Sequence, residues 1–159
     1  MHFLFFYSIL GWSMSQPLPI GEFRWLSPDE INSTDFFNVA DDSDYGFMIE
    51  ADIEYPEHLH DNHNHLPLCP DKIAILDEFL SPFQLNLKQE TSSRTSTNIK
   101  KLAPNFFNKK NYILHYRNFK YYTEKGLKVT KIHRVISFRQ KPWIKEYINF
   151  NTKMRQQAD

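Results

Sequence analysis

The stretch from Phe47 to Tyr55 constrains the fold most, because two kinds of side chain alternate along it. Its apolar members are Phe47, Ile49, Ala51, Ile53 and Tyr55, and three of the residues between them are Glu50, Asp52 and Glu54. A period of two predicts a β-strand that turns one face toward a core. The carboxylates would suit divalent-ion binding or acid–base chemistry. No second carboxylate motif accompanies them, so we interpret the row as a solvated face.

The residues before this strand predict only short elements. Residues 1–12 form an apolar run that lacks a basic start and is shorter than the roughly 20 residues that cross a bilayer. We therefore expect a buried strand or helix there, and a protein that is not secreted. Two prolines and a glycine interrupt residues 15–40, which predict a connector. Within it, Ser27 followed by Pro28 and Glu30 has the form of a capped helix start.

The residues after this strand predict a mixture of strands and helices. Residues 86–101 are polar and rich in Ser and Thr, which indicates a mobile loop or an insertion. The patterns further along predict strands at 112–115 and 129–139, a helix from Asn118 to Lys125 with Gly126 at its end, and a helix from Pro142 to about Arg155. Strands and helices without regular alternation indicate an α+β fold, and 159 residues indicate one domain.

The single cysteine, Cys69, excludes an internal disulfide and favours a reducing, intracellular setting. It lies in LPLCP, without a basic neighbour that would lower the pKa of its thiol. We interpret it as a small structural residue.

The two parts of the chain carry opposite charge. Residues 100–159 contain 15 Lys and Arg against 3 Asp and Glu, a formal charge of +12. The whole chain has 19 basic and 19 acidic residues, so the first 99 residues carry a formal −12. Aromatic residues are interleaved with the basic ones from Tyr112 onward. Lysine and arginine neutralise phosphates and flat rings stack on bases, so this block predicts contact with a polyanion. A solvated basic face over an aromatic core is the alternative.

Five basic residues are the best candidates for phosphate contact, namely Arg134, Arg139, Lys141, Lys145 and Arg155. Lys141 and Lys145 flank Trp143 near a predicted helix start, where backbone N–H groups also attract anions. Alternation with Ile132 and Ile136 predicts that Arg134 is partly buried.

Four histidines, His58, His60, His63 and His65, lie within HLHDNHNH. Imidazoles two apart on an extended segment are able to meet at one metal ion, and Glu54 or Asp61 would complete a ligand set. The spacing is not a known ligand motif. We favour a polar loop and keep a small metal-binding protein as an alternative.

Three stretches carry a family resemblance. They are LGWSMSQPLPIGEFRWLSPDEI, EADIEYPEHLHDNHNHLPLCPDK and the run from KLAPNFFNKKNYILHYRNF to YINFNTKMRQQA. In this order, over about residues 7–158, they resemble protein-primed family B DNA polymerases of the Polinton/Maverick mobile-element and viral type. The resemblance implies that 1–159 is a partial polymerase palm, an incomplete domain with an antiparallel sheet and packed helices. It also implies DNA, dNTP and terminal protein as partners, an intracellular or nuclear location, and no membrane.

The sequence departs from this family where the chemistry takes place. In the family, aspartates from separate motifs hold two Mg²⁺ ions for nucleotidyl transfer. The first motif reads like D-x-N-N-L-Y-G-W, and alignment on Gly11-Trp12 puts Phe5 at the Asp and Leu10 at the Tyr. The fingers motif K-x-x-x-N-x-x-x-G and the paired-Asp motif do not occur before Asp159. We therefore expect no catalytic residue, no specific Mg²⁺ binding and no polymerisation by this chain alone, with a nucleic-acid-binding remnant as the alternative.

Overall fold

The computed structural model describes residues 9–91 and 100–158 of the chain. Its strands are β1 (Leu18–Trp25), β2 (Tyr45–Glu54), β3 (Asp71–Ala74), β4 (Lys100–Ala103), β5 (Lys109–His115) and β6 (Lys128–Lys141). Its helices are α2 (Pro28–Ser33), α3 (Pro82–Glu90), α4 (Tyr116–Glu124) and α5 (Lys145–Ala158), with 3₁₀ turns η1 (Glu57–Leu59) and η2 (Asp77–Phe79). Residues 9–14 are also helical.

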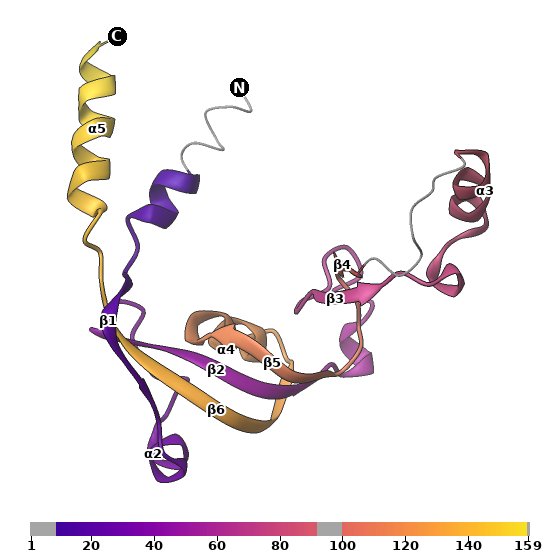
Figure 1. The fold of residues 1–159 in the computed structure, drawn as a ribbon, viewed down its shortest axis with the longest axis horizontal. Helices are drawn as coiled ribbons and strands as arrows, with labels where there is room; N and C mark the ends of the chain where they lie inside the picture. The colour runs from indigo at the N-terminus through magenta and orange to yellow at the C-terminus, as the bar shows by residue number, and fades with distance from the viewer. Residues whose placement is uncertain (1–8, 92–99, 159) are drawn as a thin grey trace.

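Four antiparallel strands form the main sheet in the order β1-β6-β2-β5, and β3 pairs with β4 in a separate two-stranded sheet. This arrangement confirms the α+β class. Figure 1 shows the main sheet strongly twisted, with α5 and the helical residues 9–14 extending beyond one end. The small sheet and α3 lie beyond the other end. In the described ranges, no helix is long and apolar enough to cross a membrane.

The core lies against one face of β2, as its alternating sequence predicts. Ile49 and Ala51 are fully buried there, and Leu114 of β5 and Val135 of β6 extend the same apolar surface. Helix α4 packs against β2 and β5. It contributes Phe119 to a cluster of aromatic rings that completes the core.

The helix ends follow local sequence signals. Ser27 caps α2 as predicted, since its hydroxyl accepts from the Glu30 N–H and the Glu30 carboxylate accepts from the Ser27 N–H. Gly126 follows α4 with a φ of 96°, the left-handed conformation expected there. The predicted N-cap Asn118 is wrong. His115 occupies that position, and its Nδ1 accepts from the Arg117 N–H.

Two segments predicted as irregular contain regular structure. Residues 15–40 include β1, where Pro19 is tolerated because β1 is an edge strand. The loop predicted at 86–101 is helical to Glu90 and strand from Lys100, and residues 92–99 lie outside the described ranges.

The N-terminal prediction is tested only in part. Residues 1–8 lie outside the described ranges, whereas 9–14 form a helix, one of the two predicted alternatives. That helix is not buried, because Ile9, Leu10 and Trp12 are exposed.

Candidate nucleic-acid interface

The face of the main sheet that points away from the core presents both rings and charges, and we call it the open face. Strand register aligns Trp25, Ile136, Met48 and His115 in one row across it. The next row holds Arg134, Glu50 and Ile113. Trp25 and Ile113 are exposed. The open face therefore carries apolar side chains that the described part of the chain leaves accessible.

The predicted solvated row of carboxylates is instead paired with cations on neighbouring strands. Glu50 lies 2.6 Å from Arg134, Asp52 lies 3.2 Å from Lys110, and Glu54 lies 3.6 Å from Lys128. The side chains of these three acids are 15, 11 and 43% exposed, whereas those of their basic partners are 62, 77 and 62% exposed. The carboxylates thus lie beneath a layer of positive charge.

Asp52 holds together two irregularities of the sheet. Its carboxylate accepts from the N–H of Asn111, whose φ of 50° marks a bulge in β5. On the other side, His133 is the extra residue where the β2–β6 register shifts, and its Nε2 lies 2.9 Å from the Asp52 carboxylate. The pKa of Asp52 lies well below its usual range, mainly because its carboxylate accepts from the Asn111 N–H. His133 and Lys110 lower it further.

Two of the five predicted phosphate-contact residues are ion-paired. Arg134 pairs with Glu50 and also lies over the Trp25 ring, 5.3 Å from its centroid. It is exposed rather than partly buried, because the bulge at His133 changes the alternation of β6. Arg139 pairs with Glu22 at 3.1 Å.

Lys141, Lys145 and Arg155 make no ion pair within the described ranges, and we call these three the basic arm. Lys141 ends β6, Lys145 begins α5, and ten residues of helix place Arg155 about 15 Å further along. Alternation along β6 turns Lys141 to the face opposite Arg134. Arg139, two residues before Lys141, shares that face, so the five candidates do not lie on one face of the sheet.

The four histidines do not converge. His63 Nδ1 lies 2.7 Å from the Tyr55 hydroxyl, and the His60 ring stacks on Phe106 with centroids 4.4 Å apart. His58 and His65 are exposed. Across residues 9–91 and 100–158, no three acidic, His or Cys side chains gather as a metal site. The loop uses two of its imidazoles for packing.

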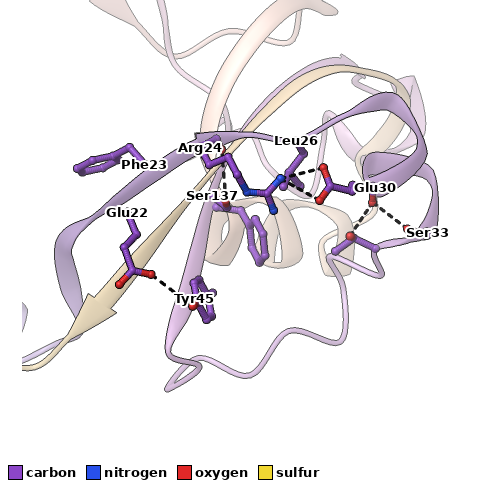
Figure 2. A pocket seen from close by; sticks show the side chains of 10 residues that line it. Glu22, Phe23, Arg24, Leu26, Glu30, Ser33, Tyr45 and Ser137 are labelled. Atoms are coloured by element: carbon purple, nitrogen blue, oxygen red, sulfur yellow. Dashed lines mark hydrogen bonds and ion pairs between the residues drawn. The ribbon is translucent and has the colours of Figure 1, made fainter.

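A hollow of about 730 Å³ lies between β1, α2 and β2, and no sequence motif predicts it. Figure 2 shows Arg24 reaching Glu30, with both N–O distances within 2.9 Å, and Tyr45 reaching Glu22. Because these polar groups satisfy one another, we assign no ligand to the hollow.

Cys69 is fully buried, and burial raises the pKa of its thiol to about 12. This confirms its interpretation as a structural residue.

No protein-family model, curated protein or solved structure matches the chain.

Proposed function

We propose that this chain is a palm-region piece of a DNA-directed DNA polymerase that contacts DNA without carrying out nucleotidyl transfer. The three resembling stretches support this proposal, and the antiparallel α+β fold is compatible with it. The same proposal includes dNTP and terminal protein as partners of the intact polymerase, and an intracellular or nuclear setting.

The basic arm is the observation that carries DNA contact. Three cations without an ion-pair partner in the described ranges lie from the end of β6 along α5, and Lys153 adds a fourth on the same helix. Exposed cations that lack a protein partner are available to neutralise phosphates and release their counterions. Arg134 and Arg139 are held by Glu50 and Glu22, so we assign them a smaller share of the affinity.

The carboxylate row of β2 does not offer free ligands to a Mg²⁺ ion. Glu50, Asp52 and Glu54 are each paired with a cation, and Phe5, at the family's Asp position, lies outside the described ranges. We therefore derive no catalytic step through a metal ion.

The test combines binding with primer extension. K141A/K145A/R155A should bind primer–template DNA more weakly than the parent chain. K72A/K100A/K101A is the matched control and should bind like the parent, because it removes three exposed lysines from the β3–β4 sheet instead. The parent chain with Mg²⁺ and dNTPs should not extend the primer. Equal binding by the two triple variants would refute the basic arm, and measurable extension would refute the non-catalytic assignment.

A further inference from the structure

We infer that Trp25 and Arg134 form a stacking site for an unpaired base of single-stranded nucleic acid on the open face. This inference rests on the proposed DNA contact and names the form of nucleic acid that the open face takes. It differs from the basic arm, which is able to contact the backbone of duplex and single strand alike.

The Trp25 ring is exposed, and a cation lies over it. It ends β1, pairs in register with Ile136, and keeps 58% of its surface exposed. The Arg134 guanidinium lies over the ring, and its 2.6 Å contact with Glu50 holds it there. A ring that a neighbouring side chain restrains before binding loses less conformational freedom when a base stacks on it.

A second exposed ring lies beside the first. Phe23 precedes Trp25 by two residues on the same strand, which separates them by about 6.6 Å. Phe23 contacts Phe138, which shares a face of β6 with Ile136, and it also lines the hollow beside Arg24 and Ser137, so it lies at the bulged edge of the open face. Two neighbouring rings suit successive bases of a flexible single strand, whereas bases in a duplex stack on each other.

The outer layer of the open face is basic and suits a polyanion, and the flat rings beside it favour a nucleic acid over an acidic protein surface. Arg134, Lys110 and Lys128 form its outer layer, above the less exposed carboxylates that they pair with. Lys131 is exposed and lies opposite Asp52 in the same sheet. A strand whose bases stack on Trp25 would meet Lys131 with its phosphates, and Arg134, Lys110 and Lys128 would contribute less because carboxylates already pair with them.

Binding of a short fluorescein-labelled oligothymidylate tests the inference. W25A should weaken binding about tenfold, as expected for loss of one base–aromatic stack, and W25F should retain most of the affinity because it keeps a flat ring. W12A removes a tryptophan of similar exposure from the helix at 9–14 and should bind like the parent. On a duplex of the same length, W25A and the parent should bind equally.

Parent-like binding of the single strand by W25A, or equal weakening by W12A, would overturn the inference. If K141A/K145A/R155A weakens duplex binding while W25A binds the single strand normally, only the stacking site fails. If the parent binds neither form of DNA, the proposed function fails with it. Circular dichroism melting of each variant separates loss of stacking from loss of fold.

Discussion

The carboxylate of Asp52 accepts a 2.9 Å hydrogen bond from the backbone N–H of Asn111. Asn111 lies in a bulge of β5, and the same carboxylate contacts His133 in a bulge of β6. One acidic side chain on the central strand β2 thus joins an irregular point of each neighbouring strand. We expect the register of this sheet to depend on that contact.

Replacing Asp52 with Asn should lower the thermal midpoint at neutral pH, because the amide loses the charge that faces Lys110 and His133. The pKa of Asp52 is lower in the folded state than its unfolded value of about 3.9. The charged carboxylate therefore stabilises the folded protein fully above that pH, and this stabilisation is lost as the pH falls toward the folded-state pKa. The difference in thermal midpoint between D52N and the parent should therefore become smaller as the pH of the measurement is lowered from 7 to about 3.

E54Q is the control for this prediction. The Glu54–Lys128 pair is longer, at 3.6 Å, and more exposed, so its loss should change the melting midpoint little. Equal destabilisation by E54Q and D52N would contradict a special role for Asp52.

Gly46 lies in β2 where no side chain fits. A Cβ there would collide with the Phe138 ring and stand 2.7 Å from Gln140 Oε1. We expect G46A to reduce the free energy of unfolding by about 1–3 kcal/mol in urea denaturation, the usual cost of overpacking. G11A is the matched control, because its Cβ would meet Ile148 at an ordinary 3.7 Å, and it should be neutral or slightly stabilising. A neutral G46A would show that this part of the sheet is loosely packed.

The Cys69 thiol should react slowly with a thiol reagent at pH 8. Burial both blocks access and raises its pKa to about 12, so little thiolate is present. Labelling followed by mass spectrometry should be fast only after denaturant is added. A native rate equal to the denatured rate would contradict the burial of this side chain.

Local patterns predicted the core strand and the capped start of α2, because alternation and capping depend only on near neighbours in the sequence. The same reasoning would have found α3, since Ser81, Pro82 and Gln84 repeat the arrangement that begins α2 and form a capping box. β1 was missed because its prolines and glycine suggest a connector, although an edge strand tolerates them.

The candidate site was harder to predict, because it depends on cross-strand register. Arg134 was expected to be partly buried and Asp52 to be solvated. Arg134 is exposed because of the bulge at His133, and Asp52 is shielded from solvent because residues of β5 and β6 contact it. Neither bulge has a signature in the residues that surround it in sequence.

The salt dependence of DNA binding tests the central claim most directly. If the basic arm neutralises phosphates, the logarithm of the parent's association constant for primer–template DNA should fall linearly with the logarithm of salt concentration. K141A/K145A/R155A should reduce the magnitude of that slope by about 2 to 3, close to one for each cation removed, while K72A/K100A/K101A should leave it nearly unchanged. A flat salt response of the parent, or equal slopes for the parent and the basic-arm variant, would contradict the account.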